Sequence, residues 1–195
     1  MKKFLPWIIA IGLIILIVKW GIGVNNMLIE KRGVSEVQWA NVESSYQRRA
    51  DLIPNLVSTV KGYASHEKET LEGVIKARSE ATKTTIDVSK LTPESIAQFQ
   101  QAQQGLSGAL SKLLLTVERY PDLKADKSFL ELQSQLEGTE NRINVERNRF
   151  NQIAGEYNII IQKIPTNFIA SLGDFEGIPL FKSDPESKNA PKVEF

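Results

Sequence analysis

The sequence predicts an all-α protein in which a bundle of long helices is attached to one membrane-spanning helix. Two observations lead to this prediction. Residues 4–24 form an apolar stretch, and three later stretches repeat apolar residues at steps of three and four positions. The first pattern is typical of a transmembrane helix, and the second of helix faces that pack against other helices. The 195 residues are enough for one globular domain with its own core beside the anchor.

The composition excludes several classes of function. The net charge is +1, so nothing indicates binding to nucleic acid or to an acidic substrate. The chain has no cysteine, which excludes disulfides, thiol catalysis and metal sites with cysteine ligands. We therefore expect no nucleic-acid partner.

Residues 4–24 are predicted to cross the lipid bilayer once. The stretch is about 20 residues long, which is the length that spans a bilayer. Trp7 and Trp20 lie near its ends, where interfacial aromatic residues are common, and Lys19 can extend its charged end to the headgroups. We assign residues 1–25 to this anchor, residues 26–181 to the helical bundle and residues 182–195 to a flexible C-terminal tail.

A cleaved signal peptide is the alternative, because Lys2 and Lys3 precede the apolar run. No small-x-small cleavage site follows the run, which favours an uncleaved anchor. Basic residues stand on both sides of the span and discriminate little between the two orientations. The short basic start is typical of a signal anchor. We therefore expect a single-pass protein of the cell membrane whose bundle lies on the non-cytoplasmic side.

A helix is predicted from Asn25 to about Lys61, and it carries the first apolar stripe. Pro54 removes a backbone hydrogen bond and is expected to kink this helix. Alternatively, Asp51 could cap a new helix that begins at Leu52. The stripe keeps its rhythm across the proline, which favours the kink. Its members are Trp39, Val42, Tyr46, Arg49, Ile53, Leu56 and Val60.

Two further helices are predicted between residues 63 and 120. The first runs from Tyr63 to about Thr84. The second begins after Thr92, which can serve as N-cap before Pro93, and it ends before Pro121, since the residue preceding a proline disfavours helix. The stripe of this second helix comprises Ile96, Phe99, Gln103, Leu106, Leu110, Leu113, Val117 and Tyr120.

The last long helix is predicted from Asp126 or Lys127 to Pro165. It would be about 55 Å long and would need a partner of similar length, which the first helix can supply. The apolar segment from Phe168 to Phe181 is expected to pack back on the end of the bundle, and a role at the membrane surface is the alternative. The stripe of the last helix comprises Phe129, Leu132, Leu136, Thr139, Ile143, Glu146, Phe150, Ile153, Tyr157, Ile160 and Ile164.

Arg49 and Glu146 are the only charged residues in their stripes. An uncompensated buried charge would cost several kcal/mol, so a pair between them is the obvious resolution. We predict that Arg49 and Glu146 meet across the bundle and fix the register of the two helices. The alternative is that one or both lie at the edge of a stripe and face water.

No constellation of residues predicts catalysis. His66 is the only histidine, and Thr70 stands where a zinc-protease helix would need the second one. The last helix lacks the Glu-x-x-His pairs of di-iron bundles, so its carboxylates are interpreted as a solvated face. These carboxylates are Glu131, Glu137, Glu140, Glu146 and Glu156. We predict no catalytic residue, no cofactor and no metal site.

Several stretches of the chain resemble the signature of LemA-family proteins. The resemblance extends from the anchor to Phe181. The stretches are residues 46–57 (YQRRADLIPNLV), 61–67 (KGYASHE), 77–78 (AR), 118–125 (ERYPDLKA), 129–136 (FLELQSQL), 139–143 (TENRI) and 147–158 (RNRFNQIAGEYN), followed by Pro165.

The resemblance implies a bacterial protein with an N-terminal transmembrane helix and an antiparallel four-helix bundle. Four helices would require a real break near Pro54 or Gly62 in place of a mild kink. No catalytic residues are established for the family, so the resemblance implies none here. One relative is linked to magnetosome formation.

We therefore expect a membrane-anchored scaffold or protein-interaction module with partners in the membrane or envelope. The candidate interaction patch is a polar segment of the first helix that comprises Arg48, Asp51, Pro54 and Asn55. Two alternatives stay open. One is a self-assembling protein that remodels membranes as a homo-oligomer. The other is a small-ligand binder or enzyme with a carboxylate-lined interior.

Overall fold

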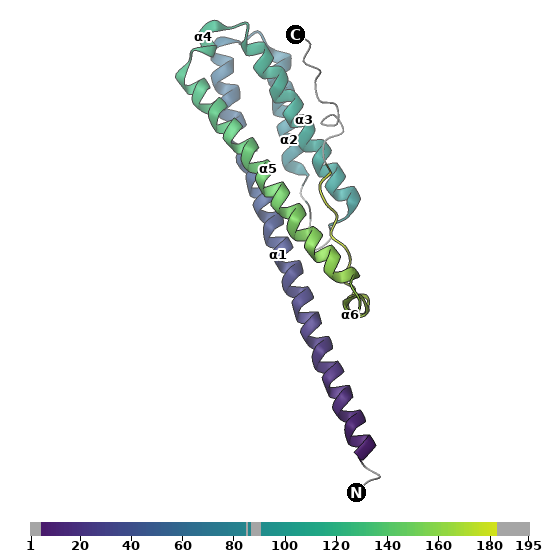
Figure 1. The fold of residues 1–195 in the computed structure, drawn as a ribbon. Helices are drawn as coiled ribbons and strands as arrows, with labels where there is room; N and C mark the ends of the chain where they lie inside the picture. Colours follow the sequence, from purple (N-terminus) through teal and green to yellow (C-terminus); the bar gives the residue numbers. More distant parts are fainter. Residues whose placement is uncertain (1–4, 85, 87–90, 183–195) are drawn as a thin grey trace, which may run out of the picture.

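The computed structural model describes residues 5–84, 86 and 91–182, and all regular secondary structure in them is helical (Figure 1). The predicted all-α class is confirmed. The helices are α1 (Leu5–Tyr63), α2 (Lys68–Lys83), α3 (Pro93–Val117), α4 (Pro121–Lys124), α5 (Lys127–Gln162) and α6 (Thr166–Leu172). Of the tail expected at residues 182–195, residues 183–195 lie outside the described residues.

Four of these helices form an elongated bundle. α5 runs antiparallel along α1, and α2 and α3 form a second antiparallel pair that packs against the distal part of α1 (Figure 1). The first third of α1 extends beyond the bundle as a single helix. We call the end of the bundle near this extension proximal, and the end with α4 distal.

The three predicted stripes form the core of the bundle. All seven members of the first stripe, from Trp39 to Val60, are at most 6% exposed. In α5, Ile143 and Phe150 are buried in the same way, whereas Ile164 at the end of the stripe is exposed. Burial of this much apolar surface is the main force that holds the helices together.

The core consists of two apolar clusters that follow one another along the bundle. The proximal cluster surrounds Trp39, whose indole lies over the ring of Phe181 at 5.4 Å between ring centres and also contacts Phe99 and Phe150. The distal cluster contains Ile53 and Leu56 of α1 with residues of α2, α3 and α5, including Leu106 and Leu113.

α1 is continuous through Pro54 and ends at Tyr63. A break at Pro54 is therefore wrong, and the break that the resemblance implied lies beside Gly62. Pro54 has no N–H to donate to the carbonyl of Ala50 one turn earlier. Nε of Arg78 in α2 donates to that carbonyl at 2.7 Å instead. A neighbouring helix thus supplies the hydrogen bond that the proline removes.

Side chains cap the two later long helices. Thr92 Oγ1 accepts a hydrogen bond from the N–H of Ser95, and Ser95 Oγ accepts one from the N–H of Thr92, which forms a capping box before Pro93. Asp126 accepts the N–H of Phe129 at the start of α5. Both predicted starts are confirmed.

The distal turns are braced against each other. The sequence predicts that the second helix begins at Tyr63. The chain instead reverses at residues 64–67, and α2 begins at Lys68. The Tyr63 hydroxyl donates to Asp126 at 2.9 Å, and the Tyr120 hydroxyl donates to Glu67 at 2.9 Å. The connection before α5 contains the short helix α4. The first hydrogen bond joins the end of α1 to the start of α5, and the second joins the chain after α3 to the start of α2.

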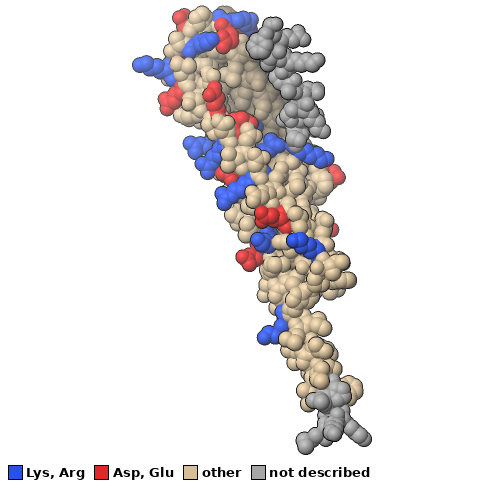
Figure 2. Space-filling model, in the orientation of Figure 1, with Lys and Arg blue, Asp and Glu red and all other residues tan. Residues whose placement is uncertain are grey.

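The proximal extension of α1 has the surface of a membrane span. Its large apolar side chains from Trp7 to Ile22 are between 42% and 70% exposed, so the protein itself does not cover them. α1 is the one helix in the described part of the chain that is long and apolar enough to cross a membrane. Charged side chains are spread over the bundle and are almost absent from this end (Figure 2). The same helix continues into the core without interruption.

We predict that Arg78 and Pro54 are energetically coupled. Arg78→Met leaves the buried carbonyl of Ala50 without a donor and should destabilise the full chain by about 1–3 kcal/mol. In a Pro54→Ala background the N–H restored at position 54 can donate to this carbonyl, so the same substitution should cost clearly less. Thermal unfolding in mild detergent of the wild type, both single variants and the double variant measures the coupling. Equal costs in the two backgrounds would contradict the compensation.

Candidate functional site

A buried cation lies between the two apolar clusters. The Arg49 side chain is 3% exposed, and its guanidinium makes four hydrogen bonds. Nη1 donates to Glu140 Oε2 at 2.8 Å and to Ser107 Oγ at 3.0 Å. Nη2 donates to the side-chain oxygen of Gln103 at 2.7 Å and to its backbone oxygen at 3.3 Å. The guanidinium carbon also lies 5.1 Å from the centre of the Tyr46 ring, which favours the cation.

These hydrogen bonds connect all four long helices. Arg49 belongs to α1, Glu140 to α5, and Gln103 to α3. Gln103 in turn donates through Nε2 to the carbonyl of Ala81 in α2 at 3.2 Å. We call Arg49, Gln103, Ser107 and Glu140 the polar layer. Because each of its charge-assisted hydrogen bonds depends on direction, this layer specifies how the helices align.

The partner predicted for Arg49 is wrong. The sequence pairs it with Glu146, but the structure pairs it with Glu140, whose side chain is 49% exposed at the edge of the bundle. Glu146 lies about two turns further along α5, where it accepts a hydrogen bond from the buried Gln38 at 2.8 Å. Arg142 lies 3.8 Å from its other oxygen. The two charges of the stripes are thus neutralised separately, and the structure does not bring them together.

A groove opens beside the polar layer between α1, α3 and α5. It has a volume of about 630 Å³, and Arg49, Gln103, Glu140 and Arg147 are among its lining residues. The Arg147 guanidinium lies 4.8 Å from the centre of the Phe181 ring and donates to the carbonyl of Lys182 at 3.3 Å. The groove is thus lined by charged and hydrogen-bonding side chains.

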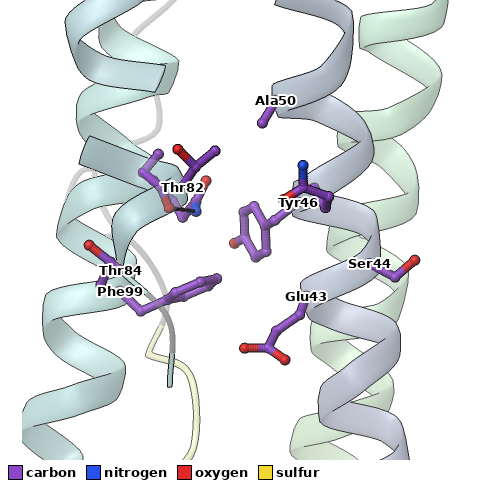
Figure 3. A pocket seen from close by; sticks show the side chains of 10 residues that line it. Glu43, Ser44, Tyr46, Ala50, Thr82, Thr84 and Phe99 are labelled. Atoms are coloured by element: carbon purple, nitrogen blue, oxygen red, sulfur yellow. Dashed lines mark hydrogen bonds between the residues drawn. The ribbon is translucent and has the colours of Figure 1, made fainter. Parts of the chain in front are cut away.

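A smaller pocket of about 270 Å³ lies between α1 and the α2–α3 pair (Figure 3). The carboxyl group of Glu43 extends into it from α1, whereas Ser44 points away. Burial raises the pKa of Glu43 above its ordinary value. The hydroxyls of Thr82 and Thr84 donate to carbonyls of their own helix. These hydroxyls are therefore not positioned as nucleophiles.

Metal-binding side chains do not converge in the described part of the chain. No group of three or more histidine or acidic side chains there could hold a metal ion. His66 is exposed in the turn after α1, and Glu67 beside it binds Tyr120 and Arg119. On α5, Glu131, Glu137 and Glu156 are exposed. These three carboxylates thus lie on a solvated face, whereas Glu140 and Glu146 bind the buried side chains of Arg49 and Gln38.

The candidate interaction patch lies on the outer surface of α1. Arg48, Asp51, Pro54 and Asn55 are all exposed. Asp51 accepts a hydrogen bond from Gln47 at 2.8 Å on the same helix. Asn55 also borders a shallow groove of about 420 Å³ between α1 and α5. The patch is accessible, and its use as an interaction surface stays a prediction.

Two asparagines that the sequence did not single out as site residues hold the segment after α6. Asn158 donates to the carbonyl of Ile178 and accepts its N–H, both at 2.7 Å. Asn151 makes the same pair of hydrogen bonds with Phe181, at 3.0 and 2.9 Å. They lie two turns apart on one face of α5, next to stripe residues. This spacing was the only sign in the sequence that the two side chains act together. The hydrogen bonds of the two asparagines hold Phe181 against Trp39. The expected packing of this segment on the bundle is confirmed for Ile178 and Phe181.

The amino-acid sequence is similar to those of known proteins. The model of the LemA family matches residues 38–195. The Protein LemA of Metamycoplasma hominis is 28% identical over 154 residues, which cover 78% of this chain and 67% of that protein. The magnetosome protein MamQ of Magnetospirillum gryphiswaldense is 26% identical over 172 residues, and MamQ 2 of Paramagnetospirillum magneticum has the same identity. The chain covers 62% of each MamQ protein. None of these names describes an enzyme.

We predict that Gln103→Leu destabilises the protein more when Arg49 is present than when it is absent. The substitution removes the side-chain acceptor of a buried cation and the donor to the Ala81 carbonyl, and it should cost about 1.5–3 kcal/mol. In an Arg49→Met background no cation is left unpaired, so most of this cost should disappear. Thermal unfolding of the full chain in detergent gives both values, and Gln101→Leu at an exposed position of the same helix is the control. A cost of Gln103→Leu that does not depend on residue 49 would refute the role of the polar layer.

Proposed function

Because the chain belongs to the LemA family, whose model covers residues 38–195, we propose that it is a membrane-anchored helical scaffold that binds other membrane or envelope proteins. One observation carries the proposal. The helix that forms the candidate span is also the central helix of the bundle, without a break between Leu5 and Tyr63. A rigid connection of this kind presents a protein surface at a fixed height above the bilayer, which a flexible linker would not do.

The character of the interior supports binding rather than catalysis. Two apolar clusters fill the bundle, and Arg49 between them is occupied by structural hydrogen bonds. The polar groups that stay accessible lie on the outer surface, in the patch around Arg48 and Asp51 and in the groove beside Arg147. Such surfaces suit a partner with complementary charges.

The patch can be tested in living cells. With a photo-crosslinking residue in place of Asn55 in the full chain, we expect discrete crosslinked products in native membranes. The same residue in place of Gln101 on α3 is the control. The combined variant Arg48→Glu and Asp51→Arg should reduce the products several-fold, because it inverts the charges of the patch, whereas Lys112→Glu should not. Products that are equal for both crosslinker positions, or insensitive to the inversion, would contradict a specific interface.

The mass of the product also distinguishes a partner from a second copy. Ile29 and Val37 of α1 are 56% and 66% exposed beyond the span, so self-association is the alternative to a different partner. A crosslinked product of twice the mass of the chain would favour self-assembly.

The proposal includes the cell membrane as location and the non-cytoplasmic side for the bundle. The support is the short basic N-terminus before a single candidate span. Alkaline phosphatase fused after residue 195 should be active in a bacterial host, because this enzyme folds only outside the cytoplasm. A fluorescent protein at the same place is the matched reporter for the opposite side. An inactive phosphatase together with a bright fluorescent fusion would reverse the assignment.

A further inference from the structure

α6 carries an apolar face that the described part of the chain leaves uncovered. Ile164, Phe168 and Leu172 are 80%, 64% and 83% exposed. Phe168 and Leu172 lie four residues apart, which places them on one side of α6, and Ile164 lies in the turn just before the helix. No charged residue occurs between Lys163 and Asp174. A fully exposed apolar face without a single charge is unusual for a helix surrounded by water.

A neighbouring face of α6 rests on the last turn of the candidate span. A Cβ placed on Gly21 would lie 3.4 Å from Cδ1 of Ile169, and one placed on Gly173 would lie 3.4 Å from Oδ1 of Asn25. Trp20 and Ile22, beside this contact, are 42% and 57% exposed. The apolar surface of α1 is therefore at the same level as α6.

α6 is held in one orientation. Its axis lies across the axis of α1 at the proximal end of the bundle. Figure 1 shows this, because α6 is viewed nearly along its axis and α1 from the side. The N–H of Phe175 donates to the carbonyl of Ala170 at 2.9 Å across Asp174, whose φ is 52°, and this closes the helix as a Schellman motif. The hydrogen bonds of Asn158 with Ile178 then fix the chain beyond it.

We propose that α6 lies in the lipid–water interface, with Ile164, Phe168 and Leu172 in contact with the bilayer. A bilayer that surrounds Trp20 and Ile22 reaches α6, because Ile169 packs against the residue between them. A helix that lies across the span and is apolar on its outer face has the geometry of an interfacial helix. This second contact prevents rotation of the bundle about the axis of α1. It therefore determines which face of the bundle points along the membrane and which points away from it.

The absence of cysteine makes a direct test simple. We would introduce a single cysteine in the full chain as Leu172→Cys, label it with the fluorophore NBD and reconstitute the protein in vesicles of phosphatidylethanolamine and phosphatidylglycerol. Leu115→Cys is the matched control. Leu115 is also a leucine, it is 72% exposed, and it lies near the distal end of α3. Both side chains are exposed, so neither substitution removes packing from the core.

The label at position 172 should emit at shorter wavelength than the label at position 115. Lipids with a nitroxide near the headgroup should quench it several-fold more strongly, and iodide in the water should quench it less. Equal quenching at the two positions would overturn the proposal. A label at position 172 that is shielded from iodide and also from nitroxide lipids would overturn it as well, because protein would then cover the face. Neither result depends on whether the patch around Arg48 binds a partner.

Discussion

The structure depends on the continuity of one helix. α1 has 59 residues and is about 90 Å long. A helix of this length is not stable by itself in water, so each part of it needs either protein or lipid. The 36 residues of α5 match the part of α1 from Leu28, the first fully buried residue, to Tyr63. The part of α1 before Leu28 has no such partner helix, and the lipid of the membrane would cover it. The end of α5 therefore coincides with the end of the candidate span, and this is why α6 reaches the level of the bilayer.

The polar layer gives the bundle its alignment. Two apolar clusters alone would tolerate a shift of one helix by seven residues, because such a shift preserves the stripe. The same shift would move Arg49 to the place of Val42 or of Leu56, and both of these are completely buried among apolar side chains. There its charge would have no acceptor. The layer thus allows one register, and the same argument explains why a charged residue stands in a stripe that is otherwise apolar.

Periodicity and local chemistry made the helices and most of the core predictable. The spacing of apolar residues predicted the buried stripe from Trp39 to Val60, and Thr92 and Asp126 predicted helix starts. Both kinds of pattern depend only on residues that are close together in the sequence. The partners of Arg49 could not be predicted in this way. A long guanidinium reaches past its own stripe, so its partner depends on how the helices are rotated and on what α3 contributes. Likewise, the uninterrupted helix at Pro54 depends on Arg78 of another helix.

The most direct test of this account is hydrogen–deuterium exchange of the full chain in lipid nanodiscs, followed residue by residue between the span and the bundle. Gly21, Gly23, Asn25, Asn26 and Gly33 are the positions where a hinge would form most easily, since glycine and asparagine weaken a helix. If α1 is one rigid rod, the amides from residue 19 to residue 60 should be protected without a gap. Rapid exchange between residues 25 and 33, with protection on both sides, would show a flexible tether and contradict the account.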